Sequence, residues 1–314
     1  MAGILFITSN RLGDAVLSTG ALAHVMEKWP GVPVVVACGP LPAPLFEGMP
    51  GIARVIRLKK GPWARHWRRL LRACAFTRWD VVVDLRNSLV SRLLVAKKRI
   101  IAKPSRTLRH KVVELAELVG ASPPPAPRLW ISEKDAAKAE ELMRGQTPIF
   151  ALGPAANWRG KTWRAERFAE LAQKLVADGG ARVAVFAARS ERAQVAAVLA
   201  AIPQGQLLDL VDLDSLPLTA ACLARCRLFI GNDSGLMHMA SAVDCPTIGL
   251  FGPSHDEVYA PWGNACRVVR TPESFDDIVS RPGYNHLTTD TLMDGITVSD
   301  VYGAAMKLLD VKSC

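Results

Sequence analysis

The chain has 314 residues, half of them hydrophobic, with 39 Lys and Arg against 29 Asp and Glu. This length exceeds what one hydrophobic core usually serves, so it predicts two domains. No apolar run is long enough for a transmembrane helix, and the start, MAGILFITSN, lacks the basic region of a signal peptide. Together with seven scattered cysteines that form no C-x-x-C pair, this predicts a cytoplasmic protein with reduced thiols.

The positive charge is concentrated in the first half of the chain. Residues 1–145 hold 24 Lys and Arg but only 11 Asp and Glu. Between Arg54 and Lys111 there are 18 basic residues and two acidic ones, Asp80 and Asp84. A field of this sign attracts phosphate groups, whether these belong to nucleic acid, anionic lipid or a phosphorylated saccharide.

Strands alternate with helices from the first residues onward. Five short runs rich in β-branched and apolar residues predict strands at 3–9, 32–38, 53–59, 78–85 and 97–103. A helix from Asp14 to about Lys28 separates the first two. Such alternation predicts a parallel sheet with helices on both faces.

One of the predicted helices, 62–76, is amphipathic and basic. At helical spacing, one side carries Trp63, Trp67, Leu70, Leu71 and Cys74, and the other carries Arg65, Arg68, Arg69 and Arg72. The simpler interpretation is an apolar stripe packed on the sheet with solvated arginines. The alternative is a helix that lies against an anionic membrane surface, an arrangement that the two tryptophans would suit.

A second strand–helix series follows a Pro-rich connector at 121–129 and a short charged helix at 132–143. We place the linker at 144–149, which gives domains at 1–145 and 146–314. Strands are expected at 147–154, 181–188, 206–210, 228–231, 247–251 and 265–270. A closing amphipathic helix is expected at 297–310.

The most informative stretch is RLFIGNDSGLMHMASAVDCPTIGLFGP, residues 227–253. It predicts a buried strand, a turn at 232–235, a compact helix and a second buried strand. A helix that starts right after a strand presents free N–H groups and the positive end of its dipole, an arrangement that binds phosphate. Taken alone, Asp233 and Ser234 could equally cap the helix while His238 packs inside.

The whole string D-S-G-x-x-H-x-A-S-A, followed by P-T-x-G-L-F-G-P, resembles the nucleotide-sugar site of glycosyltransferase family 9, the bacterial heptosyltransferases. The resemblance implies that Asp233, Ser234, Gly235 and His238 contact the diphosphate and sugar of an ADP-sugar donor. It also implies the GT-B architecture, an α/β fold of two doubly wound Rossmann-like domains facing a central cleft. The donor then binds the C-terminal domain and the acceptor binds the N-terminal one. In this architecture a C-terminal helix often crosses back to the first domain, a role that the helix at 297–310 could fill.

Asp14 lies in SNRLGDAVLSTG, residues 9–20, which is similar to the N-terminal motif of that family. A carboxylate just past the first strand can act as general base on an acceptor hydroxyl. A lone Asp there would more simply stabilise the helix dipole. The resemblance implies that Asp14 is the base and that Gly13 lets the acceptor approach. Asn10 and Arg11 stand where the family often has small polar residues, and Arg11 is a candidate contact for an acceptor phosphate.

Two further places resemble the family's donor site. The loop GPAANWRGKTW, 153–163, presents Lys161 as a point charge for the diphosphate, with Trp163 beside it and Arg159 as a weaker companion. Glu191 follows the strand at 181–188, where an acid can bind a ribose hydroxyl. Each has an ordinary alternative, a solvated lysine and a helix N-terminal acid. The turn before Glu191, AARS, also lacks the family's glycines.

The resemblance implies an inverting transferase that moves a heptose from ADP-heptose, and the basic N-terminal half suits a phosphorylated lipid A or core oligosaccharide acceptor. Neither a metal nor a cofactor is expected, because Lys161 and the helix N-terminus offset the charge of the leaving diphosphate. The pair Asp212 and Asp214 resembles a metal motif of other glycosyltransferases, but we interpret it as part of a helix cap with Ser215. The expected location is the cytoplasm, peripheral on the inner membrane through the basic domain. Two alternatives remain: a related transferase for another nucleotide sugar or acceptor, and a non-catalytic nucleotide or polyanion binder.

Overall fold

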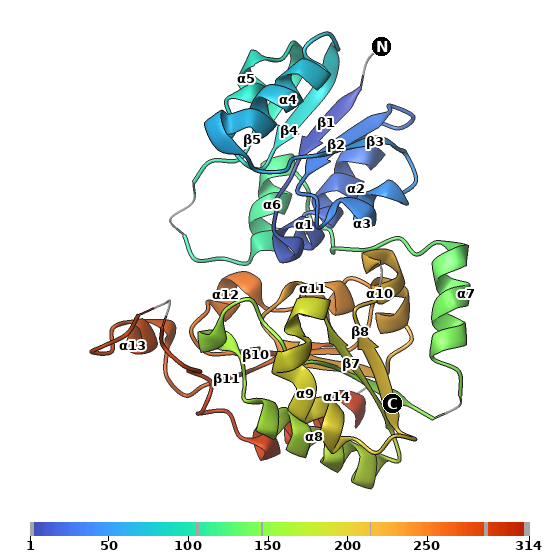
Figure 1. Ribbon diagram of the computed structural model, residues 1–314. Coiled ribbons are helices and arrows are strands. Elements are labelled where there is room, and N and C mark those ends of the chain that lie inside the picture. Colours follow the sequence, from blue (N-terminus) through green and yellow to red (C-terminus); the bar gives the residue numbers. More distant parts are fainter. Residues whose placement is uncertain (1–2, 105–106, 146, 214, 286–287, 311–314) are drawn as a thin grey trace. The chain divides into compact units, whose positions relative to one another are not determined.

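The computed structural model describes residues 3–104, 107–145, 147–213, 215–285 and 288–310. The chain divides into two compact units, 1–132 and 133–314 (Figure 1). The division lies before α7 (Glu133–Leu142), not at 145/146 as the sequence predicts, because α7 packs on α10 (Leu216–Leu223) of the second unit.

The first unit is a five-stranded parallel sheet with the order β3-β2-β1-β4-β5. Its strands are β1 Ile4–Ile7, β2 Val34–Cys38, β3 Ile52–Arg57, β4 Trp79–Asp84 and β5 Ala96–Ile101. Its helices are α1 Leu12–Leu17, α2 Thr19–Lys28, α3 Ala43–Glu47, α4 Arg65–Cys74, α5 Val90–Leu93 and α6 Lys111–Val119. All five predicted strands are therefore present, each shorter than the run that indicated it.

Helices cover both faces of this sheet, and its central strand β1 is apolar and buried throughout. In β1, Ile4 and Phe6 join the core beneath α2, α3 and α6, whereas Leu5 and Ile7 join the core beneath α4 and α5. Successive side chains of a strand point to opposite faces, and this alternation gives the unit two cores from one short run.

The predicted helix from Asp14 to Lys28 is interrupted at Ser18. The Ser18 hydroxyl donates to the carbonyl of Ala15 at 2.7 Å and shares a hydrogen bond with the Thr8 hydroxyl at 2.8 Å. A serine side chain that bonds its own backbone competes with the helix ladder. Two helices result, and the first begins at Leu12, so Asp14 lies in its first turn.

The Pro-rich connector crosses directly over α2. A Cβ on Gly20 would lie 2.3 Å from the carbonyl oxygen of Pro125, so only glycine allows this approach. The connector is thereby fixed to the first unit before the chain enters the second.

The second unit is a six-stranded parallel sheet with the order β11-β10-β9-β6-β7-β8. Its strands are β6 Ile149–Gly153, β7 Arg182–Ala187, β8 Leu207–Val211, β9 Leu228–Asn232, β10 Thr247–Phe251 and β11 Cys266–Arg270. Its helices besides α7 and α10 are α8 Ala165–Gly179, α9 Arg192–Ala201, α11 Gly235–Ser241, α12 Asp256–Tyr259, α13 Phe275–Val279 and α14 Val298–Asp310. Helix α14 packs on α8 and β11 of its own unit.

Candidate active site

The order of the strands in the second sheet reverses between β6 and β9. The chain builds β6, β7 and β8 outward to one side, then returns to lay β9, β10 and β11 on the other. In an open parallel sheet the loops that leave two such neighbouring strands diverge to opposite faces, and ligands bind in the crevice between them. The loop after β6 contains Lys161, and the turn after β9 contains Asp233 and Ser234.

Lys161 and Asp233 meet at this point. The Lys161 ammonium lies 3.2 Å from the Asp233 carboxylate, although the two residues are 72 positions apart. Their side chains are only 17% and 11% exposed. A pair this well shielded from water interacts more strongly than a surface ion pair. The structure therefore brings together two of the residues that the sequence singles out.

Asn232, which the sequence analysis did not select, fastens the two loops to each other. Its amide donates to the carbonyl of Pro154 at 2.8 Å, and its side-chain oxygen accepts from the Trp163 backbone N–H at 2.9 Å. Asn232 is completely buried. Because a buried amide must be hydrogen-bonded, Asn232 fixes the ends of the Lys161 loop relative to β9.

Trp163 corrects a prediction. It was expected to contact the donor, but its side chain is completely buried in the second unit's core, edge-on to Phe168. Its indole N–H donates to the carbonyl of Ile296 at 3.0 Å. Trp163 therefore anchors the Lys161 loop from beneath and offers no surface to a ligand.

Replacing Trp163 by phenylalanine is expected to lower the free energy of unfolding by about 2 kcal/mol, through a lost hydrogen bond and a small cavity. Urea unfolding of the variant measures this loss. Phe168→Leu, in the same core but without a polar contact, is the matched control. A Trp163→Phe variant as stable as the parent chain would show that the indole contributes nothing to the loop's anchorage.

The turn into α11 does not use its side chains as a helix cap. Ser234 is the N-cap residue, yet its hydroxyl makes no cap hydrogen bond. The oxygen is buried and has no hydrogen-bond partner among the described residues. Gly235 opens the helix and is half-buried, and His238 lies one turn further on with its side chain buried. The capping alternative is thus not realised for Ser234.

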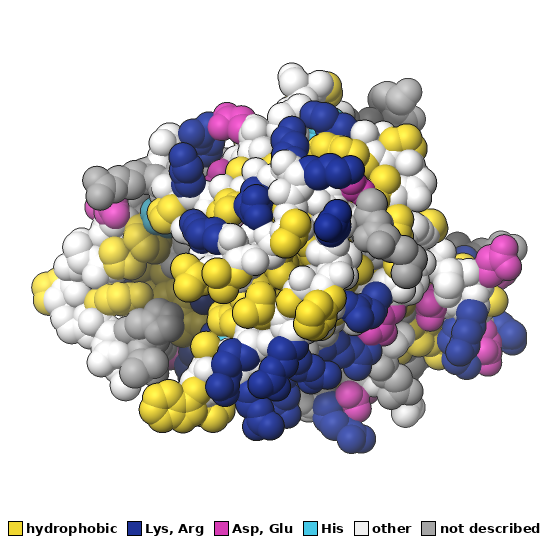
Figure 2. All heavy atoms as spheres, turned by 90° about the horizontal axis from the view of Figure 1, so that it is seen from above, with side chains coloured by type: hydrophobic (Ala, Val, Ile, Leu, Met, Phe, Trp, Pro, Cys, Tyr) yellow, Lys and Arg dark blue, Asp and Glu magenta, His cyan; other side chains and the backbone are white. Residues whose placement is uncertain are grey.

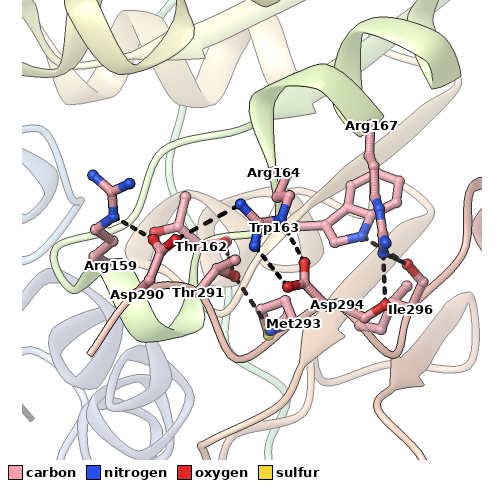
Figure 3. A network of polar contacts seen from close by, with 10 residues as sticks. All are labelled: Arg159, Thr162, Trp163, Arg164, Arg167, Asp290, Thr291, Met293, Asp294 and Ile296. Atoms are coloured by element: carbon pink, nitrogen blue, oxygen red, sulfur yellow. Dashed lines mark hydrogen bonds and ion pairs between the residues drawn. The ribbon is translucent and has the colours of Figure 1, made fainter. Parts of the chain in front are cut away.

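A segment distant in sequence, residues 290–296, forms hydrogen bonds and ion pairs with the Lys161 loop and the start of α8 (Figure 3). Arg164 makes a two-point ion pair with Asp294 at 2.6 and 2.7 Å. The hydroxyl of Thr291 donates to the carbonyl of Thr162 at 2.6 Å. Arg159, proposed as a companion of Lys161, instead pairs with Asp290 at 2.5 Å. Nothing in the sequence around 290 indicates these contacts.

Glu191 acts as an acid at the N-terminus of a helix, which was the alternative to binding a ribose. It ends a short 3-10 turn at 189–191 that follows β7, and its carboxylate accepts from the Ala188 backbone N–H at 2.9 Å. The residue still lies at the carboxyl end of the sheet, as predicted. Ser215 caps α10 by accepting from the Leu218 N–H, also as predicted, whereas Asp214 lies outside the described residues.

The first unit carries its own group of polar residues where its strand order reverses, between β1 and β4. After β1, the Ser9 hydroxyl donates to the Asp14 carboxylate at 3.2 Å. Asp14 and Gly13 are both half-buried in α1, and Arg11 is exposed at its N-terminus. The carboxylate is therefore oriented by Ser9 and remains accessible to a ligand.

Arg86, which follows β4, completes this edge. It donates to the side-chain oxygen of Asn10 at 2.9 Å and lies over the Trp67 ring, 5.0 Å from its centroid. Burial lowers the pKa of the Arg86 guanidinium, while the nearby Asp84 opposes this effect. Asp84 is fully buried and accepts from Ser88 and from the Arg86 backbone N–H, so it fixes the turn that presents Arg86.

Neither unit offers an evident metal site within the described ranges. No group of three or more His, Cys, Asp and Glu side chains there is arranged to hold a metal ion. In the same ranges, no helix has both the length and the apolar composition needed to span a bilayer.

Two Rossmann-like parallel sheets in one chain are the arrangement of the GT-B fold of glycosyltransferases. Solved glycosyltransferase structures have the same fold. The structure matches an ADP-heptose lipopolysaccharide heptosyltransferase II from E. coli with a TM-score of 0.80, at 21% identity, covering 99% of this chain and 100% of that one. It matches a family 9 glycosyltransferase from Veillonella parvula with a TM-score of 0.81, at 21% identity, covering 98% and 96%.

Comparison of the sequence, unlike that of the fold, identifies the family. Residues 97–280 match the model of glycosyltransferase family 9 (heptosyltransferase), and the chain belongs to this family of enzymes. Lipopolysaccharide heptosyltransferase 2 of Salmonella typhimurium is 26% identical over 304 residues, covering 85% of this chain and 87% of that protein. Lipopolysaccharide heptosyltransferase 1 of Pseudomonas aeruginosa is 25% identical, covering 83% and 82%.

Proposed function

We propose that the protein transfers a heptose from ADP-heptose to a hydroxyl of the lipopolysaccharide inner core, with inversion at the anomeric carbon. The observation that carries the proposal is the Lys161–Asp233 pair at the reversal point of the second sheet. Membership of family 9 supports the type of sugar and acceptor.

In this proposal the second unit binds the donor. Lys161 and the Ser234 hydroxyl face the diphosphate, because an ammonium and an unpartnered hydroxyl both suit phosphate oxygens. The Asp233 carboxylate would repel phosphate, so it holds Lys161 in place and accepts hydrogen bonds from sugar hydroxyls. Gly235 allows close approach, His238 supports the sugar side, and Glu191 remains the proposed partner of the ribose.

The first unit binds the acceptor. Asp14 accepts the proton of an acceptor hydroxyl, whose oxygen attacks the anomeric carbon from the side opposite the diphosphate. The bond between that carbon and the phosphate oxygen breaks, ADP leaves with the bonding electrons, and the configuration inverts. Lys161 offsets the charge that develops on ADP. Arg11 and Arg86 supply positive charge for a phosphorylated acceptor near Asp14.

A lipid-linked acceptor of this type also implies that the protein works at the inner membrane's cytoplasmic face. The basic residues between Arg54 and Lys111 suit the phosphates of such an acceptor and the anionic surface that carries it.

A panel of ADP-, UDP- and GDP-sugars tests the donor assignment by thermal shift, because a ligand that binds only the folded state raises the melting temperature. ADP-heptose is expected to give the largest shift. A larger shift with a UDP- or GDP-sugar would replace the proposed donor. Binding of ADP-heptose without transfer to any core acceptor would favour a non-catalytic nucleotide binder.

A further inference from the structure

Helices α4 and α5 cover the same face of the first sheet and leave an unusual outer surface. Their inner sides are apolar, with Leu70 and Cys74 of α4 and Val90 and Leu94 of α5 buried in one core. The side chains that remain exposed around this pair of helices form what we name the α4–α5 face. It comprises Trp63, Arg65, Arg68, Arg69, Arg72, Phe76, Leu89, Arg92, Leu93 and Val95.

Half of this face is apolar. Leu89 and Leu93 lie one helical turn apart and are 71% and 61% exposed, although Val90 and Leu94 already satisfy the core. Trp63 is 88% exposed and stands in the left-handed backbone region at φ 54°, which is rare for a large side chain. In the described part of the chain, every exposed large hydrophobic side chain belongs to the first unit. Such clustering marks an interaction surface.

The other half of the α4–α5 face is positively charged, and carboxylates of the described residues do not neutralise its four α4 arginines. Arg65, Arg68, Arg69 and Arg72 are exposed, and no ion pair joins them to a carboxylate of the described residues. Elsewhere many exposed arginines are paired, such as Arg57 with Glu47. Figure 2 shows one face of the molecule on which hydrophobic side chains border a dense group of Lys and Arg.

We infer that the α4–α5 face docks on an anionic phospholipid bilayer, with Trp63, Leu89 and Leu93 entering the interface and the arginines meeting lipid phosphates. A bilayer offers both apolar depth and diffuse negative charge, whereas a protein partner would have to match each arginine individually. Tryptophan is enriched at the level of lipid headgroups.

The α4–α5 face lies beside the candidate acceptor site of the first unit. Trp63 follows the carboxyl end of β3, and Leu89 follows that of β4, the edge of the sheet that holds Asp14 and Arg86. Docking through this face brings that edge close to lipid headgroups, where a lipid-linked acceptor presents its sugar. This purpose, though not the docking itself, rests on the proposed function.

Sedimentation with vesicles tests the inference without donor or acceptor. The protein is expected to bind phosphatidylglycerol–phosphatidylethanolamine vesicles and not pure phosphatidylcholine vesicles. Leu89→Ser/Leu93→Ser should weaken this binding about tenfold. Arg68→Gln/Arg69→Gln should weaken it about 25-fold, at roughly a factor of five for each charge near the surface.

Two matched variants serve as controls. Leu108→Ser changes an exposed leucine that precedes α6, and Arg225→Gln/Arg227→Gln removes two exposed charges from the second unit. Both should bind vesicles like the parent chain. The inference is overturned if the parent chain ignores anionic vesicles, if the double leucine variant binds undiminished, or if the controls lose as much. Transfer to a water-soluble acceptor fragment should be unchanged in the leucine variant, so failed docking and failed catalysis are distinguishable.

Discussion

Replacing Asp14 by asparagine is expected to lower the rate of heptosyl transfer about 10³-fold, because an amide cannot accept the proton of the attacking hydroxyl. Asparagine keeps the size of the side chain and can still accept the hydrogen bond from Ser9. The affinity for ADP-heptose should stay within about twofold of the parent value, since the donor is bound by the second unit in our account. Single-turnover kinetics and calorimetric titration of the donor measure the two effects separately.

Ser9→Ala is the matched control for this variant. It removes the hydroxyl that donates to Asp14 but leaves the carboxylate. A lost hydrogen bond to a charged group corresponds to about a tenfold lower rate, well short of the loss expected for Asp14→Asn. An Asp14→Asn variant that turns over within about tenfold of the parent chain would mean that another group removes the proton.

Lys161→Ala is expected to lower kcat/KM by about 10²- to 10³-fold, because it removes the charge that stabilises the departing diphosphate. It also leaves the Asp233 carboxylate without its ion-pair partner in a site that is largely shielded from water. Lys161→Arg, which keeps the charge, should recover part of the activity but not all, since a planar guanidinium places its charge differently.

Measurements of nucleotide binding show whether Lys161 contacts the phosphates or maintains the shape of the pocket. Lys161→Ala should weaken the binding of ADP about tenfold or more and leave adenosine nearly unaffected, because only ADP carries the diphosphate. Equal losses for ADP and adenosine would show that Lys161 maintains the local structure instead. A melting temperature measured for each variant shows whether the fold is intact.

The sequence predicts the strands of this protein well because both sheets are buried on two faces. The runs of β1 and β10 are almost entirely apolar and buried throughout, and a run of that kind bounded by turn residues leaves few alternatives. Breaks caused by single side chains are harder to predict. Ser18 divides α1 from α2 through hydrogen bonds to Ala15 and to Thr8, a contact that requires the strand to be in place.

The exposure of side chains and the anchorage of loops are harder to predict from sequence than the strands. Trp63 matched the apolar stripe of the helix at 62–76, but α4 begins only at Arg65, and Trp63 lies outside the stripe. Trp67, Leu70, Leu71 and Cys74 do pack inward as predicted, with the four arginines exposed. Trp163 was expected at the ligand because its motif was matched as a unit, whereas only packing distinguishes an anchoring residue from a contacting one.

The sequence indicates residues that meet at the candidate site, but not the residues that hold them in place. Lys161 and Asp233 were both selected, and their pairing follows from the strand order. Asn232, Arg86 and Asp294 were missed because each acts through a partner more than 60 residues away. Such contacts leave no periodic signal in one sequence.

The central claim is that this chain moves an intact heptose from a nucleotide to a core-sugar hydroxyl. The most direct measurement follows one turnover with ADP-heptose and a heptose-deficient lipid A–core acceptor, and quantifies released ADP and heptosylated product by mass spectrometry. Our account predicts equal amounts of the two, with the new linkage of opposite anomeric configuration to the donor. Release of ADP without a heptosylated product, or a product that keeps the donor's configuration, would contradict it.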